Sequence, residues 1–410
     1  MKKLIITALL VVGATLTSLA QLSMSPYSRY GYGLLNDNTT STQRAMGGIG
    51  YAMHSGRQIN VMNPASYAHC DSLTFLFDMG IDMTALWSKE NGHSGRDLGG
   101  GLDYITMQFP VSKTVGMSLG LLPYSSVGYS FGSKIDYGKS ERSGNGGLNQ
   151  LYLGAGWEPV KGLSAGVNLS YLFGTTTNDL YATTDAGSQS LYERVMIVRD
   201  YHVQFGLQYT CKLSSANTLS AGLTYSPGKD LRGHTYGIYY DVKADAKPDT
   251  IGYMSLRHNY SLPDTWGAGI NYEWNNRFMA EIDFTYQPWS KAKYAPMESF
   301  EQTRLADRYK IAAGVQWVPS PRGSYLRRIQ YRLGGYFNRD YLTIRSNNVH
   351  EYGLSAGFGL PAPGSKTIVN IGLEYKHRQA HPAPLLKENY FCLTIGVNFN
   401  EMWFWRSKIR

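Results

Sequence analysis

The chain has 410 residues, with 39 Lys and Arg against 30 Asp and Glu, and a formal net charge of +9. Charged residues make up only 17% of the sequence, whereas 45 residues are Gly and 32 are Tyr. This composition argues against two or three soluble domains and favours a β-barrel wall with one apolar and one wet face. Cys70, Cys211 and Cys392 are far apart and form no CxxC pair, which argues against a disulfide framework or a zinc site.

Residues 1–20 have the organisation of a secretory signal peptide. Lys2 and Lys3 form a positive start, residues 4–16 are apolar, and Ser18-Leu19-Ala20 is a small-x-small cleavage site. We therefore expect cleavage after Ala20. The mature chain would start at Gln21, which is not Cys, so no lipoprotein anchor is expected. No later run of 18 apolar residues predicts a transmembrane helix.

Residues 21–70 differ from the rest of the chain. Residues 45–67 show neither the period of a strand nor that of a helix, and their glycines permit close backbone approach. A compact, glycine-rich segment before a long β chain is what a plug requires. We therefore expect residues 21–70 to form a periplasmic N-terminal segment and a hatch in the lumen; the alternative is a flexible arm. The expected ligand and hatch residues are Gly47, Gly48, Gly50, Asn63, Pro64 and Ala65.

Residues 71–400 alternate between apolar and polar positions over segments of about ten residues. Val167 and Phe284 fall on the apolar face, whereas Ser170, Glu281 and Asp283 fall on the opposite, lumen-facing side. Six short turns alternate with seven long connections, such as those over residues 89–96, 133–146 and 175–193. The pattern predicts an all-β fold, a transmembrane antiparallel β-barrel of about 14 strands with both termini in the periplasm.

Pro123 interrupts the third predicted strand. Proline cannot donate a hydrogen bond to a neighbouring strand, so it forces an edge, a bulge or a kink. We expect the barrel wall to part near residues 122–128, where small residues leave space; the alternative is that Pro123 lies at the outer lip of the strand. The expected lateral opening comprises Pro123, Ser125, Ser126 and Gly128.

Two blocks of sequence resemble a known family. The first is the glycine-rich run that leads into Asn63-Pro64-Ala65. The second contains Leu262-Pro263-x-x-Trp266, Tyr286-x-x-Trp289-Ser290 and residues 306–314 in the same order and spacing. Together they resemble the FadL-type outer-membrane transporters of long-chain fatty acids and other hydrophobic compounds. The chain departs from that family at residues 54–57, where acidic residues are usual, and this departure leaves the choice of ligand open.

The resemblance implies an outer-membrane, porin-like channel in a Gram-negative bacterium for passive uptake of fatty-acid-like or aromatic molecules, released laterally into the bilayer. Its partners would be membrane lipid, lipopolysaccharide and the hydrophobic ligand. The alternative is a non-transporting scaffold barrel in a multi-protein outer-membrane complex, for example one for outer-membrane protein assembly. Residues 401–410, a periplasmic tail with three aromatic and three basic side chains among Trp403–Arg410, could dock an envelope protein there. A continuous apolar conduit would favour transport, and a polar, plugged lumen would favour the scaffold.

The sequence contains little that indicates catalysis or metal binding. No G-x-S-x-G sequence occurs, and the histidines fall on separate predicted strands or loops. His377 and His381 have a metal-like spacing, but a Pro-rich loop is expected there. No nucleic-acid motif is present. We therefore expect no enzyme activity, no cofactor, no metal and no nucleic-acid partner.

Overall fold

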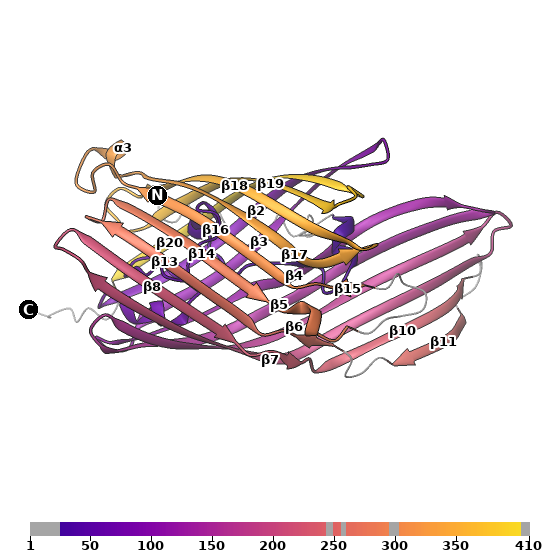
Figure 1. Ribbon diagram of the computed structural model, residues 1–410, viewed down its shortest axis with the longest axis horizontal. Coiled ribbons are helices and arrows are strands. Elements are labelled where there is room, and N and C mark those ends of the chain that lie inside the picture. The colour runs from indigo at the N-terminus through magenta and orange to yellow at the C-terminus, as the bar shows by residue number, and fades with distance from the viewer. Residues whose placement is uncertain (1–24, 243–248, 256–259, 295–302, 403–410) are drawn as a thin grey trace, which may run out of the picture.

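The computed structural model describes residues 25–242, 249–255, 260–294 and 303–402 (Figure 1). Fourteen antiparallel strands form a closed barrel, because the last strand pairs with the first along almost its whole length. The all-β, 14-stranded fold expected from the alternation is therefore confirmed. The expected signal peptide and most of the expected tail, residues 403–410, lie outside the described residues.

The barrel strands follow one another in chain order around the wall. They are β2 (Thr74–Glu90), β3 (His93–Pro110), β4 (Val115–Ile135), β5 (Gly138–Val160), β6 (Leu163–Thr184), β7 (Gln189–Lys212), β8 (Asn217–Ser226), β13 (Thr265–Trp274), β14 (Phe278–Gln287), β16 (Arg308–Trp317), β17 (Gln330–Ile344), β18 (Asn347–Pro361), β19 (Ile368–His381) and β20 (Lys387–Met402).

Smaller elements lie inside the barrel or beyond its rim. Strands β10 (Gly233–Val242) and β11 (Asp249–Ser255) extend the sheet beside the first half of β7. The short strands are β1 (Leu34–Leu35), β9 (Lys229–Asp230), β12 (Ser261–Leu262) and β15 (Arg304–Leu305), and the helical turns are η2 (Pro26–Arg29), α2 (Ser41–Arg44), η3 (Pro64–His69), η4 (Trp289–Lys291) and α3 (Tyr325–Arg328). Among the described residues, no helix has the length and apolarity needed to span a membrane.

The two faces of the wall follow the sequence alternation. On β14, Ile282 is 63% exposed on the outer face, whereas Glu281 and Asp283 are buried on the inner face. On β6, Val167 and Leu169 are exposed and Ser170 is buried. The apolar side chains therefore form the outer surface and the polar side chains line the lumen, which is the arrangement of a barrel in lipid.

Several expected long connections are strands instead. Residues 89–96, 133–146 and 175–193 belong to hairpins in which β2–β3, β4–β5 and β6–β7 pair almost up to a tight turn. Figure 1 shows β5, β6 and β7 continuing, with β10 and β11, well past the shorter β8, β13 and β14. The sequence hides these strands because residues 138–147 are polar on both faces, so no apolar alternation marks them.

Residues 25–70, here called the N-terminal segment, lie inside the barrel. Helix α2 contacts β18, β19 and β20, whereas η3 contacts β3 to β7 on another part of the wall. Wall glycines make room for this close approach. A Cβ atom at Gly166 would lie 2.3 Å from the carbonyl carbon of Pro64, and one at Gly334 would lie 2.1 Å from that of Met46. The wall and the segment are thus fitted to each other backbone against backbone.

Candidate functional site: the lumen and the β3–β4 seam

Two carboxylates of β14 hold the middle of the N-terminal segment. Asp283 Oδ2 accepts hydrogen bonds from the amides of Gly50 (2.6 Å) and Tyr51 (3.0 Å). Glu281 Oε1 accepts one from the amide of Ala52 (2.9 Å). The predicted lumen-facing side of these two acidic residues is therefore correct. They supply acceptors to backbone amides that would otherwise be buried without partners.

The Asn-Pro-Ala sequence forms the start of η3. Asn63 Oδ1 accepts a hydrogen bond from the Ala65 amide (3.1 Å), and its side-chain amide donates to the Tyr51 carbonyl oxygen (2.7 Å). Pro64 occupies the first helical position, where its missing N–H costs nothing. Asn63 and Ala65 are fully buried. The three residues thus fix a turn against the wall.

The glycines among residues 47–50, in the middle of the segment, lie in close contacts. Gly47 and Gly48 have φ angles of +77° and +78°, which L side chains rarely adopt. A Cβ atom at Gly47 would lie 2.8 Å from the backbone of Gly335, and one at Gly50 would lie 2.3 Å from the side chain of Gln43. The six expected hatch residues therefore all lie in tight contact within the lumen, at two separate places on the wall.

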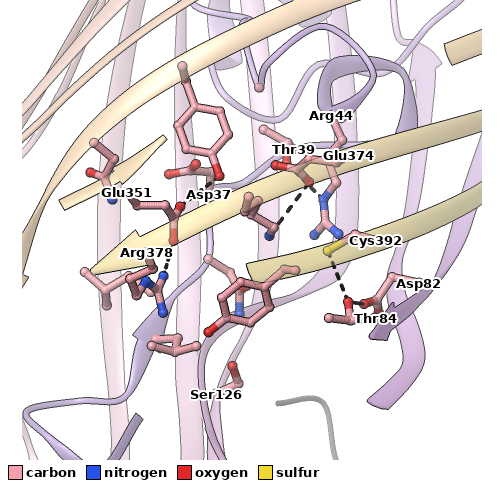
Figure 2. Close-up of a pocket in the computed structure, with 18 of the residues that line it drawn as sticks. Asp37, Thr39, Arg44, Asp82, Thr84, Ser126, Glu351, Glu374, Arg378 and Cys392 are labelled. Carbon is pink, nitrogen blue, oxygen red and sulfur yellow. Dashed lines mark hydrogen bonds and ion pairs between the residues drawn. The ribbon is translucent and has the colours of Figure 1, made fainter. Parts of the chain in front are cut away.

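A charged cavity of about 140 Å³ lies between residues 34–48 of the segment and the wall. Asp37 accepts hydrogen bonds from Arg308 (2.9 Å) and Lys310 (2.5 Å), two side chains of β16. Arg44 donates to Asp103 of β3 (2.6 Å). Figure 2 shows Asp37 and Arg44 among the residues that line this cavity. Two oppositely charged residues of the segment are thus each paired with the wall.

The electrostatics of Asp37 follow from these partners. Burial raises its pKa, but the positive charges of Lys310 and Arg308 outweigh that effect, so the pKa lies below its usual range. Asp37 therefore carries its charge at neutral pH and the ion pairs are intact.

A further charged pair lines the same cavity. Arg378 of β19 pairs with Glu351 of β18 and lies 3.9 Å from Asp340 of β17. Figure 2 shows Arg378 and Glu351 joined in this way across neighbouring strands. A second cavity of about 90 Å³ lies beside Asn36 and Asn38, and its wall carries Gln150, Asn168, His202 and Gln204. Neither cavity provides a continuous apolar path.

The wall parts at Pro123. Strand β3 pairs with β4 only from Pro110–Gly116 to Ile105–Leu121, whereas β5 pairs with β4 along its whole length as far as Ile135. The register of β4 against β5 shifts between Pro123 and Ser125, which marks a bulge. Pro123 thus lies inside β4, and the separation of β3 from β4 beyond Leu121 is here called the β3–β4 seam.

The N-terminal segment covers the first part of the seam. Leu34 and Leu35 pair with Ser126 and Ser125 as the short strand β1. Further along, the Ser28 hydroxyl accepts a hydrogen bond from the Gly128 amide (3.0 Å). The four residues expected to line a lateral opening therefore lie together at the seam, where Ser125, Ser126 and Gly128 contact the chain's own N-terminal segment.

Sequence reasoning missed the charged pairs. Arg308 and Lys310 fall within residues 306–314, the block used for the family resemblance, yet no charge partner was assigned to them. Their spacing of two residues on a predicted strand was the available signal, because it places both on one face. Their partner Asp37 lies 271 and 273 residues away and could not be identified from spacing.

No metal centre is present among the described residues, which contain no group of three or more His, Cys, Asp or Glu side chains arranged to hold an ion. His377 and His381 lie at the end of β19 and not on the expected loop. His377 Nδ1 lies 2.8 Å from the side-chain oxygen of Asn389 on β20. Residues four apart in a strand are separated by about 13 Å along the chain, which is not the close spacing of two ligands to one metal ion.

Solved structures that are similar to this chain include transport proteins. The chain is similar to the CymD monoaromatic hydrocarbon channel (TM-score 0.60, 14% identity, 91% of this chain and 99% of that chain). It is also similar to the toluene transporter TodX of P. putida (0.61, 13%, 92% and 100%) and to a FadL homologue of Pseudomonas aeruginosa (0.61, 11%, 90% and 99%). At such identities the likeness shows the fold, a 14-stranded barrel of the FadL architecture.

A comparison with protein families assigns the chain more specifically than the fold does. A family model described as BamG matches residues 1–410, and the chain therefore belongs to the BamG family. The sequence matches no curated protein.

Proposed function

We propose that the protein is an outer-membrane barrel that acts as a non-transporting scaffold within a multi-protein complex. The observation that carries this proposal is the plugged lumen. The N-terminal segment packs inside it against buried apolar side chains of the wall and is also tied to the wall by the pairs of Asp37 with Arg308 and Lys310 and of Arg44 with Asp103. The match to the family model described as BamG points in the same direction.

An apolar ligand gains little from such a lumen. Burial of apolar surface contributes about 25 cal/mol per Å² only where the new surroundings are apolar. Here the ligand would have to displace charged pairs, and separating a buried pair leaves uncompensated charges that cost several kcal/mol. Binding of an apolar ligand in the lumen is therefore unfavourable, and this supports a protein that acts by binding partners on its outer surfaces.

The outer face supports a location in lipid. Exposed Leu, Ile, Val and aromatic side chains recur at alternate positions of the barrel strands, for example Leu207, Leu223, Ile270, Ile311 and Leu354. Together with the expected signal peptide, this apolar surface supports insertion in the outer membrane of a Gram-negative bacterium, in contact with lipid and lipopolysaccharide. Residues 401–410 remain a proposed docking tail.

The test is native purification of the full-length protein from membranes in mild detergent, followed by native mass spectrometry and single-channel recording. A scaffold gives a complex of fixed stoichiometry with other envelope proteins and no conductance in planar bilayers. A protein that purifies alone, binds hydrophobic molecules and carries them across liposome membranes would contradict the proposal.

Passive uptake of a hydrophobic molecule with lateral release is the second candidate. The β3–β4 seam favours it, because β3 no longer pairs with β4 beyond Leu121, at the position expected for a lateral opening. Solved structures of the same fold are described as toluene and monoaromatic hydrocarbon channels. In this second candidate Gly47, Gly48, Gly50 and residues 63–65 would act as the gate. Uptake of a hydrophobic probe by cells, lost on deletion of the gene and restored by the intact chain, would favour this candidate.

A further inference from the structure

The outer face of the wall is hollowed where β7, β8, β13 and β14 run side by side. One row of paired residues crosses these four strands: Leu207, Leu223, Ala268 and Phe284. Ala268 is the small member of the row, and a hollow of about 290 Å³ with an almost entirely apolar lining lies there. Leu207, Leu223 and Phe284 are exposed. The hollow therefore opens on the face of the barrel that meets lipid and not on the lumen.

An aromatic row bounds this hollow on the side toward β10 and β11. Its paired members across the same four strands are Phe205, Tyr225, Trp266 and Tyr286. The rings of Tyr225 and Trp266 lie 4.2 Å apart, and the Tyr225 hydroxyl donates a hydrogen bond to Asp264 (2.9 Å). Tyr and Trp side chains with an apolar body and a hydrogen-bonded tip are typical of a membrane–water interface. The hollow thus lies just inside that interface.

Strand β7 changes its neighbour just beyond the aromatic row. Strand β8 pairs with β7 as far as Phe205, and β10 joins β7 only at Val198. Between these points, residues 229–232 are held against β7 by the buried Asp200, which accepts hydrogen bonds from Lys229 Nζ (2.7 Å) and the Arg232 amide (2.8 Å). The Arg199 amide donates to the Arg232 carbonyl oxygen (3.1 Å). Arg199 and Arg232 are therefore backbone neighbours at the interface.

These two arginines carry charge that the described chain does not compensate. The carboxylates of this region each have another cation: Asp200 has Lys229 (2.7 Å), Asp230 has Lys293 (2.8 Å) and Asp264 has Lys291 nearby. No carboxylate among the described residues forms an ion pair with Arg199 or Arg232. Arg199 is exposed on the same strand face as Tyr201, and the guanidinium carbon of Arg232 lies 5.8 Å from the Tyr201 ring centroid. Two guanidinium groups therefore lie together above the hollow.

An occupant of this surface must be apolar in the hollow and anionic at the arginines. Tyr201 and Phe205 are four residues apart on β7, about 13 Å along the strand, which is within the depth of one leaflet of a hydrocarbon core about 30 Å thick. Guanidinium groups bind phosphate through paired hydrogen bonds. The arginines lie on the side of the extended hairpins, which faces outward in outer-membrane barrels. These features together describe a phosphorylated, acylated lipid of the outer leaflet.

We propose that the hollow and the two arginines form a binding site for lipopolysaccharide. One acyl chain of its lipid A part occupies the hollow over Ala268, and a lipid A phosphate binds Arg199 and Arg232. This inference rests on the proposed location in the outer membrane and is independent of the scaffold role.

The charge of the site is tested by the double variant Arg199→Gln with Arg232→Gln. Its matched control is Lys134→Gln with Lys139→Gln. These two lysines are also exposed and lie on the same side of the membrane, at the end of the β4–β5 hairpin, but away from the hollow.

The shape of the site is tested by Ala268→Phe, which fills the hollow. Ala85→Phe is its control, because Ala85 lies between the exposed Met83 and Trp87 on the outer face of β2 and does not line the hollow. Heat-modifiable migration on a gel verifies that each variant forms a barrel, and the charge variant tests the site whether or not Ala268→Phe folds.

The probe is bis-phosphorylated lipid A, titrated against full-length protein in detergent and followed by native mass spectrometry. We expect one saturable lipid per barrel, bound about tenfold more weakly by the double Gln variant and by Ala268→Phe, with less than about twofold change in either control. Salt of about 1 M, where the Debye length is about 3 Å, should weaken binding to the wild type and leave the double Gln variant unchanged. Absence of saturable binding, or equal binding to the double Gln variant and its control, would overturn the proposal. Phosphatidylglycerol bound as tightly as lipid A would overturn the assignment to lipopolysaccharide.

A photoreactive leucine analogue at Leu223 tests the site in native membranes, with one at the exposed Leu98 of β3 as control. The proposal requires more lipopolysaccharide adducts at Leu223 than at Leu98, and a fall to the Leu98 level in the double Gln variant. Equal labelling at the two positions, or adducts of Leu223 with another protein in place of lipid, would overturn it. If the wild type co-purifies with no envelope protein, the scaffold falls and the lipid titration still decides the site. Absence of the protein from the outer-membrane fraction would overturn both the location and the site.

Discussion

At the scale of residues, the lumen is organised by charges whose partners come from distant parts of the chain. Asp37 has two cationic partners on one strand, Arg308 and Lys310, and both cations are buried. A buried cation without a counter-charge lowers the stability of the fold. The Asp37 carboxylate is therefore needed, although its side chain is 29% exposed. The pairs therefore fix where residues 34–48 lie.

Asp37→Asn tests this dependence. It removes the carboxylate with which both cations pair, so we expect a loss of stability toward the lower end of about 3–5 kcal/mol, the cost of breaking a buried pair. Chemical unfolding in detergent measures it, with the exposed Asp185→Asn as control. The pKa of Asp37 is lowered on folding, so its contribution is present above the unfolded value of about 4 and is lost as pH falls below it. The gap between wild type and variant should therefore shrink below about pH 4. A gap that persists unchanged in acid would show that the charge is not its cause.

At the scale of elements, two strands show how the residue sequence shapes the wall. Strand β6 shows which face meets lipid, because Val167 is exposed and Ser170 is buried. Strand β4 shows where the wall is interrupted, because Pro123 lies beside the bulge, past the point where pairing with β3 stops.

Val167→Arg tests the orientation of β6. A cation on the lipid face near the midplane costs about 2–4 kcal/mol. We expect that loss when folding is measured in lipid bilayers. The conservative Val167→Leu should cost less than about 1.5 kcal/mol and controls for shape. Equal stability of the arginine and leucine variants in bilayers would mean that this face does not meet lipid.

Pro123→Val tests the origin of the seam. Valine restores an amide and favours strands, so we expect the β3–β4 pairing to extend past Leu121. Amide hydrogen exchange should then slow for residues 122–128 in the variant. Under the uptake candidate, entry of a hydrophobic probe should fall while the barrel still folds. Pro159→Val, at the exposed end of β5, is the control. Unchanged exchange at residues 122–128 would mean that the N-terminal segment, and not Pro123, keeps the strands apart.

At the scale of the whole molecule, the barrel and the N-terminal segment close the lumen together. The segment reaches β14 through residues 50–52, β16 through Asp37 and β3 through Arg44, so it spans the interior. Removing its middle should open the lumen to water, where the inner face of the wall carries polar side chains such as Glu281 and Asp283 beside apolar ones such as Leu76 and Leu122.

Deletion of residues 45–65 tests this closure. We expect the wild type to be silent in planar bilayers and the deletion variant to conduct ions, because the deletion removes the residues that block the middle of the lumen. Heat-modifiable migration on a gel verifies that the variant still forms a barrel. A folded variant that stays silent would show that other elements close the lumen.

The sequence by itself determined the barrel. Alternation is a local property, so the two faces, the chain order of the strands and the inward side of Glu281 and Asp283 follow from residues 71–400 alone. It also placed Pro123 in the third strand, because a missing amide is a property of one residue. The side-chain pattern did not predict the extended ends of the hairpins. Residues 138–147 carry polar side chains on both faces and pair through backbone groups, which leave no alternation in the sequence.

The tertiary structure decided what the lumen contains. The partners of Asp37 lie more than 270 residues away, and β1 reaches the edge of β4 across about 90 positions. Such contacts depend on how the closed wall brings distant strands to one cavity, and neither spacing nor periodicity carries that information. The same closure leaves residues 129–135 of β4 without a neighbour among the described strands, because β3 turns away to pair with β2 alone.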